Sequence, residues 1–288
     1  MGHSNNGHAS KITLGGLIVT LGIIYGDIGT SPLYVMSEII GKDLISADIV
    51  KGGLSCIFWT LTLQTTIKYV ILTLRADNKG EGGIFSLYTL VKRTKFKWLL
   101  VAAIIGGSAL LADGIITPPI SVAAAVEGLR FFNPQLNTIP IVIGILFALF
   151  FIQQFGTSFI GKFFGPLMMA WFGMLGILGL MQLSNDWTVF AALNPYYAFH
   201  LLNTHPSGIL ILGAVFLCTT GAEALYSDLG HCGKQNIRIS WIFVKIALVL
   251  NYFGQGVWLI SHEGQKLDSF KSTNPFFAMM PETFLPYG

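Results

Sequence analysis

Three acidic side chains interrupt long apolar stretches of this 288-residue chain: Asp27, Asp113 and Glu223. A carboxylate at membrane depth is energetically costly, so it is a functional-site candidate unless a buried structural partner explains it. Each of the three acids stands beside a helix-breaking sequence or a row of hydroxyl side chains. A purely structural role, in which each acid pairs separately with a buried partner, explains this pattern poorly. We therefore expect the three carboxylates to share one site near the middle of a bilayer.

The neighbours of these acids carry hydroxyl oxygens at helical spacing. Positions three, four, seven or eight residues apart lie on one face of a helix. Such positions hold hydroxyl side chains near every acid, namely Tyr34 after Asp27, Thr117 and Ser121 after Asp113, and Thr220 before Glu223. Carboxylate and hydroxyl oxygens suit a hard cation, and no cysteine or histidine stands among them to favour zinc. The pattern predicts a cation site and no bound cofactor.

The same acids are candidates for proton exchange. Surroundings that exclude water disfavour the ionised form of a carboxylate, so one of them can carry a proton for part of a working cycle. The residues alone do not choose among Asp113, Glu223 and Asp27. An anionic substrate would be repelled by such a cluster.

Two interruptions of apolar helices must position these side chains. The first lies in GIIYGDIGTSPLY (22–34), where Gly26 and Gly29 let the backbone leave the helix and Pro32 removes a hydrogen-bond donor. The second is TTG at 219–221, just before Glu223. Lipid cannot satisfy the carbonyls and amides that a broken helix frees, so such a break must be buried in protein or line a wet cavity.

Composition assigns the chain to the membrane. It is 53% hydrophobic and only 11% charged, against about 25% charged residues in soluble domains. Nucleic-acid binding is not implied by a net charge of +3. The apolar runs are long rather than alternating, which predicts an all-α membrane protein in contact with the lipid bilayer. We expect about seven spans, at 12–40, 52–74, 98–128, 139–155, 163–183, 207–227 and 239–260.

These spans divide the chain into a polar tail (1–11), a transmembrane domain (12–261) and a segment outside the membrane (262–288). Positive loop charges concentrate on the side of the N-terminus, including the cluster Lys92, Arg93, Lys95 and Lys97. Cytoplasmic loops are enriched in lysine and arginine, so we expect a cytoplasmic N-terminus and an extracellular final segment. No nucleophile–base arrangement or nucleotide motif indicates an enzyme.

Several motifs together resemble a known family of membrane proteins. They are GIIYGDIGTSPLY, RADNKGEGGIFSLY, ADGIITPPISVAAAVEGL, QQFGTSFIGKFFGPLM, GAEALYSDLGHCGKQNIRISW and LNYFGQGVWL. In this order they are similar to the Kup (KUP/HAK/KT) potassium uptake permeases. The resemblance covers nearly the whole chain from about residue 14.

The resemblance implies a LeuT-like inverted-repeat fold of the amino acid–polyamine–organocation superfamily, with helices one and six broken. It also implies potassium uptake coupled to protons across the cell (inner) membrane. Carried over by motif, the potassium-binding residues fall on Asp27, Tyr34, Asp113, Thr117, Ser121, Thr220 and Glu223. Many relatives have Glu where this chain has Asp113, which changes the geometry and not the charge.

Length separates this chain from the family pattern. Family members have about twelve spans and a soluble C-terminal region, so we interpret the chain as an N-terminal fragment with an incomplete second repeat. The alternatives are an amino-acid permease on the same scaffold, a channel, or a non-transporting fragment or assembly partner. The three acids argue against a substrate that carries a carboxylate, such as an amino acid. The sequence has no repeated filter-like motif of the kind that a channel would need. A homodimer is left open.

Overall fold

The computed structural model describes residues 12–94, 96–131, 133, 135–154, 157–270 and 274–281. All regular structure in these residues is helical, and the only bridge-type pairing joins Asn78 to Glu81. The predicted tail (1–11), Lys95, and 271–273 and 282–288 of the final segment lie outside the described residues.

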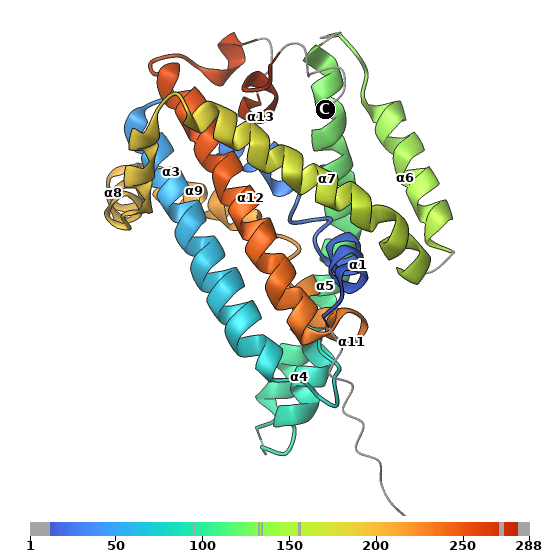
Figure 1. Cartoon of the computed structure of the whole chain (residues 1–288). Helices are drawn as coiled ribbons and strands as arrows, with labels where there is room; N and C mark the ends of the chain where they lie inside the picture. Colours follow the sequence, from blue (N-terminus) through green and yellow to red (C-terminus); the bar gives the residue numbers. More distant parts are fainter. Residues whose placement is uncertain are drawn as a thin grey trace, which may run out of the picture.

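The α-helices follow one another along the chain with few long connections (Figure 1). They are α1 (Leu14–Ile24), α2 (Val35–Ile40), α3 (Ala47–Thr60), α4 (Ile84–Val91), α5 (Trp98–Glu127), α6 (Ile139–Gln153), α7 (Thr157–Leu183), α8 (Tyr196–Thr204), α9 (Gly208–Phe216), α10 (Ala224–Ser227), α11 (Leu229–Cys232), α12 (Lys234–Ser261) and α13 (Pro275–Ala278). A π-helical stretch (Leu61–Leu72) continues α3. Short 3-10 turns cover Ser31–Leu33, Thr73–Arg75, Gly128–Phe131, Trp187–Leu193, Leu217–Thr219 and Leu267–Ser269.

Five helical segments are long and apolar enough to cross a membrane. They are Ala47–Arg75, Trp98–Arg130, Phe163–Leu183, Gly208–Ser227 and Lys234–Ser261. The class of all-α membrane protein is thereby confirmed. The first and fourth predicted spans correspond to shorter apolar helices, Leu14–Ile24 and Ile139–Ile152, which fall short of the roughly 20 residues that a bilayer needs. The count of seven spans and the LeuT-like fold stay predictions.

The core lies where α1, α7 and α12 pack together. The Tyr25 ring stacks on Trp241, with ring centroids 6.3 Å apart, and meets the edge of Phe172 at 6.4 Å. Helices α7 and α12 cross at Gly179 and Gly254. A Cβ added to Gly179 would collide with the Leu250 carbonyl, and one added to Gly254 would collide with the Gly179 backbone. Small residues at such a crossing let two backbones approach closely, which fixes the scaffold behind the breaks.

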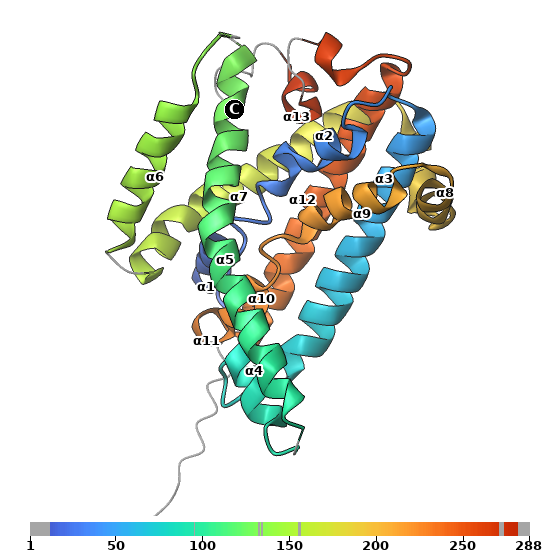
Figure 2. The same ribbon diagram turned by 180° about the vertical axis from the view of Figure 1, so that it is seen from behind.

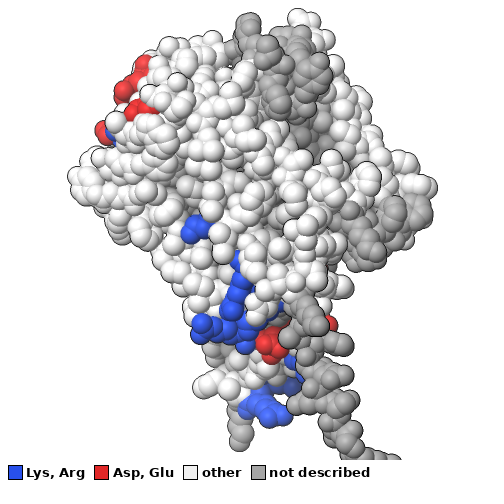
Figure 3. Space-filling view, viewed as in Figure 1, with Lys and Arg blue, Asp and Glu red and all other residues white. Residues whose placement is uncertain are grey.

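Helices α5 and α6 lie together at one side of the molecule, and α5 passes in front of the broken segments in the reverse view (Figure 2). Lysine and arginine side chains gather at one end of the surface, the end at which α4 and α11 lie (Figure 3). Acidic side chains on this face are most prominent at the opposite end.

Candidate cation site

The first break follows α1 directly. The helix ends at Ile24, and after an irregular turn the chain forms the 3-10 turn Ser31–Leu33, with Pro32 in its first turn. The Thr30 amide donates to the Asp27 carbonyl oxygen (2.9 Å), as does the Thr30 hydroxyl (2.7 Å). The glycines and proline that predict this interruption therefore lie where the backbone leaves the helix.

Side chains from distant helices satisfy the carbonyls that this break frees. Trp171 Nε1 of α7 donates to the Gly29 carbonyl oxygen at 2.9 Å. Gln255 Nε2 of α12 donates to the Pro32 carbonyl oxygen, also at 2.9 Å. The amide of Asn274 donates to the Leu33 carbonyl oxygen. Because buried carbonyls without partners are costly, these three donors explain why the irregular backbone is stable here.

Removing one of these donors should destabilise the chain. Gln255 is fully buried, and Gln255→Leu keeps its size while leaving the Pro32 carbonyl without this donor. We expect a loss of about 1–3 kcal/mol in the free energy of unfolding, the cost of an unsatisfied buried polar group. Thermal unfolding of the purified chain in detergent measures the effect, with Gln265→Leu in an exposed loop as the control. Equal stability of both variants and the wild type would contradict this role.

The second break interrupts the sixth predicted span. Helix α9 ends at Phe216, a 3-10 turn covers Leu217–Thr219, and Gly221 takes a positive φ of 86° before α10 begins. A Cβ added to Gly221 would lie 2.8 Å from Asp27 Cβ. The Ser31 hydroxyl donates to the Leu217 carbonyl oxygen at 3.1 Å. The two breaks are thus in direct contact.

The three acids meet beside these breaks. One carboxylate oxygen from each of Asp27, Asp113 and Glu223 lies within 4.8 Å of the others, and all three residues are half-buried. In the described part of the chain, no lysine or arginine forms an ion pair with any of them. Like charges at this separation repel one another strongly where water is scarce. A cation or a proton among them would relieve the repulsion.

Hydroxyl groups of α5 lie against two of the acids. Thr117 Oγ1 donates to Asp113 Oδ1 at 2.9 Å, and Ser121 Oγ lies 3.5 Å from Asp27 Oδ1. Ser121 Oγ also lies 3.1 Å from Thr30 Oγ1. The face of α5 predicted from the sequence therefore points at the first break.

The remaining predicted ligands lie nearby. Thr220 lines a cavity of about 250 Å³ together with Asp113 and Glu223. The Tyr34 hydroxyl lies 3.4 Å from the Ser31 hydroxyl, and no hydrogen bond to a carboxylate is recorded for it within the described ranges. The predicted residues thus come together around the breaks, with Tyr34 at the edge. Their oxygen atoms are the ligand type that a hard cation prefers.

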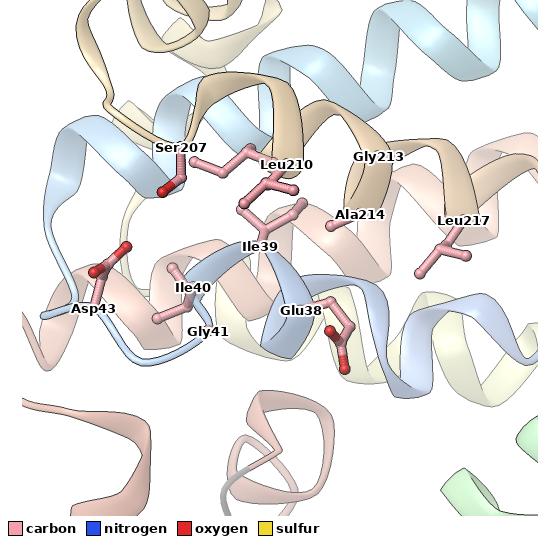
Figure 4. A pocket seen from close by; sticks show the side chains of 11 residues that line it. Glu38, Ile39, Ile40, Gly41, Asp43, Ser207, Leu210, Gly213, Ala214 and Leu217 are labelled. Carbon is pink, nitrogen blue, oxygen red and sulfur yellow. The ribbon is translucent and has the colours of Figure 1, made fainter.

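A second cavity lies between α2 and α9 and has a volume of about 380 Å³ (Figure 4). The side chains of Ile39 and Leu210 point toward one another across it. At one end, Asp43 Oδ2 lies 3.5 Å from His205 Nε2. Its middle is aliphatic, so it offers no cluster of oxygen atoms like that formed by the three acids.

Comparison with known families decides where this chain belongs. A family described as "K+ potassium transporter integral membrane domain" matches residues 14–287. The chain is 68% identical over 281 residues to a protein of Flavobacterium psychrophilum named "Probable potassium transport system protein Kup". This chain belongs to the Kup potassium transporter family.

Other Kup proteins are similar to this chain over nearly its whole length. Identity is 65% over 293 residues with the Flavobacterium johnsoniae protein of that name, and 53% over 293 residues with that of Enterococcus faecalis. These alignments cover 97%, 100% and 96% of this chain, taking the three relatives in order, but only 43%, 45% and 44% of the relatives. The chain therefore spans less than half the length of these Kup proteins. No solved structure matches it.

Membership of the Kup family confirms the resemblance carried by the sequence motifs, and this is a family of transporters rather than enzymes. The structure adds polar residues that the motifs did not single out. The first break contains Thr30, whose hydroxyl donates to the Asp27 carbonyl, and it accepts hydrogen bonds from Trp171 and Gln255. The cavity beside the acids is lined by Gln64 and Tyr69. A hydroxyl inside a predicted break, as at Thr30, was a signal that could have been used.

Proposed function

We propose that this chain forms the cation-binding part of a transporter that takes up potassium across the cell (inner) membrane in symport with protons. The observation that carries the proposal is the meeting of three carboxylates, within 4.8 Å, beside two broken helices. The half-buried acids have no lysine or arginine partner in the described part of the chain, so a small cation is the natural neutralising group. The names of the Kup relatives support potassium as that cation.

Each predicted ligand has a role in this proposal. Asp27, Asp113 and Glu223 supply charge, and Thr117, Ser121, Thr220 and Tyr34 supply neutral oxygens. Breaks at corresponding places in the first and sixth spans also support a LeuT-like arrangement, in which broken helices mark the binding site. An amino-acid permease would need positive helix ends or cations at the site, where this chain presents acids.

The orientation follows from charge. Lysine and arginine gather at the end of the molecule where α4 and α11 lie (Figure 3). Because cytoplasmic segments are enriched in these residues, we place this end and the N-terminus in the cytoplasm. The cavity between α2 and α9 then lies in the outer half of the bilayer.

Ligand-dependent stability tests the proposal. We expect potassium to raise the melting temperature of the purified chain more than sodium does at matched ionic strength, with no effect of amino acids. A ligand that binds only the folded chain adds about 2.7 kcal/mol at a hundredfold excess over Kd. Stabilisation by amino acids but not by potassium would show that the chain belongs to an amino-acid permease. A melting temperature that no cation changes would show that this chain by itself does not bind the ion.

Proton coupling makes a separate prediction. Like charges this close repel one another, and a proton or a cation among them relieves the repulsion. A potassium ion that replaces a proton there should release up to about one proton per ion bound. Release is measured as the pH change on adding potassium chloride to the chain in weakly buffered detergent solution. Choline chloride is the control for ionic strength. Potassium binding without proton release at any pH at which the chain is folded would contradict the coupling.

A further inference from the structure

Two polar side chains of the second predicted span face the cavity beside the acids. Gln64 and Tyr69 line it together with Asp113, Thr220 and Glu223. Both are half-buried, and no hydrogen bond is recorded in the described ranges for the Gln64 amide or the Tyr69 hydroxyl. A polar group at membrane depth is costly without a partner. The contents of the cavity must therefore supply one.

A change in helix winding places these two side chains together. Residues five apart in an α-helix point in directions about 140° apart, so a regular helix would send Gln64 and Tyr69 to different faces. The stretch Leu61–Leu72 is π-helical, in which each residue bonds to the fifth one along, so that positions five apart lie on the same side of the helix. Its buried residues recur at intervals of four and five positions, at Leu61, Thr65 and Val70. The π-helix is rare, and the π turns found inside α-helices frequently occur at functional sites.

Contacts with α12 hold this stretch in place on its other side. Trp241 Nε1 donates to Thr66 Oγ1 at 3.0 Å. Lys245 Nζ donates to Thr62 Oγ1 and to Thr66 Oγ1, each at 3.1 Å. Arg238 Nε donates to the Val70 carbonyl oxygen at 3.3 Å. These bonds oppose rotation of the stretch about its axis, with Gln64 and Tyr69 on the side of the cavity.

We infer that Gln64 and Tyr69 line the cation pathway, where their side-chain oxygens replace water around the ion on the cytoplasmic side of the three carboxylates. The inference rests on the proposed function and extends it to the second span. Tyr69 lies toward the C-terminal end of the span, where the ribbon runs on to α4 at the cation-rich end of the molecule (Figure 1). An ion leaving the acids in this direction meets two neutral oxygens that hold it less strongly than a carboxylate does. Such a step lets a bound ion depart.

Two substitutions of similar size test this inference. Gln64→Leu and Tyr69→Phe each remove a polar group and keep most of the side-chain volume. The potassium Kd of each purified variant is measured from potassium-dependent melting temperatures and compared with the wild type. Gln135→Leu and Tyr88→Phe are the controls, because both positions lie outside the cavity.

We expect the potassium Kd to rise about tenfold in each cavity variant, with the potassium-free melting temperature unchanged or higher. A merely structural role would lower the potassium-free melting temperature and leave Kd unchanged. Kd values within twofold of the wild type in both cavity variants would overturn the inference, while loss of binding in Asp27→Asn would still uphold the cation site. A wild-type chain without any response to potassium would overturn the site and this inference together.

Discussion

Asp27→Asn should abolish potassium binding while making the potassium-free chain more stable. Asp27 is the acid that both breaks approach: it belongs to the first, and Gly221 of the second lies against it. The substitution keeps the shape and removes the charge. Loss of a desolvated charge from its partner costs at least about 2.7 kcal/mol, a hundredfold in Kd. Repulsion from Asp113 and Glu223 also disappears, so the melting temperature without potassium should rise.

The opposite signs of these two effects distinguish a binding role from a structural one. A carboxylate that held the fold together would lose stability on conversion to an amide. Potassium-dependent melting curves and competition with radioactive rubidium measure the two quantities on the same samples. Asp268→Asn, in an exposed 3-10 turn, is the matched control and should behave as the wild type. Unchanged potassium affinity in Asp27→Asn would remove Asp27 from the site.

Gly221→Ala should disrupt the junction of the two breaks. Its φ of 86° is strained for any residue with a side chain, at a cost of about 1–2 kcal/mol. The added Cβ would also lie 2.8 Å from Asp27 Cβ and 2.9 Å from the Ile28 amide nitrogen. Overpacking of this kind costs a further 1–3 kcal/mol or so. We expect the free energy of unfolding to fall by about 2–5 kcal/mol and potassium affinity to fall with it.

A second glycine of the same span provides the control. An added Cβ at Gly213, in α9, would find no atom within 4 Å. Gly213→Ala should leave the chain as stable as the wild type or more stable by up to about 1 kcal/mol, because alanine favours the helix. Chemical denaturation of both variants in one detergent measures the difference. Equal stability of the two alanine variants would show that the breaks do not pack as described.

The breaks could be predicted from the sequence because their causes are local. Gly26, Gly29 and Pro32 act on the backbone within a few residues, and the structure interrupts the first helix there. Asp113 could be placed near the other acids because it lies fifteen positions after Trp98, the start of α5, and a helix rises evenly along its axis. Local chemistry and regular geometry therefore gave the outline of the site.

Packing between distant segments could not be predicted in this way. The approach of Gly221 to Asp27 joins residues far apart in the chain, and no pattern within either span encodes it. The donors Trp171 and Gln255 likewise bond to carbonyls of the first break, which is far from them in the chain. The stretch Leu61–Leu72 is π-helical, so the α-helical period of 3.6 residues does not predict which of its side chains share a face. For this reason the sequence did not place Gln64 and Tyr69 at the cavity.

Helix ends differ from the predicted spans because hydropathy detects the apolar part of a helix rather than its caps. The second span was predicted from residue 52, whereas α3 begins at Ala47, where the Ser46 hydroxyl accepts the Ile49 amide as an N-cap. The seventh was predicted from residue 239, whereas α12 begins at Lys234. Polar first turns lengthen both helices beyond their apolar cores.

Asp27, Asp113 and Glu223 should bind one cation together. Anomalous diffraction from crystals of the chain grown in rubidium chloride, collected at the rubidium edge, locates this cation. We expect one strong peak among the three carboxylates, and its loss in crystals of Asp27→Asn. A rubidium peak elsewhere, for example in the cavity between α2 and α9, with none among the carboxylates would contradict it.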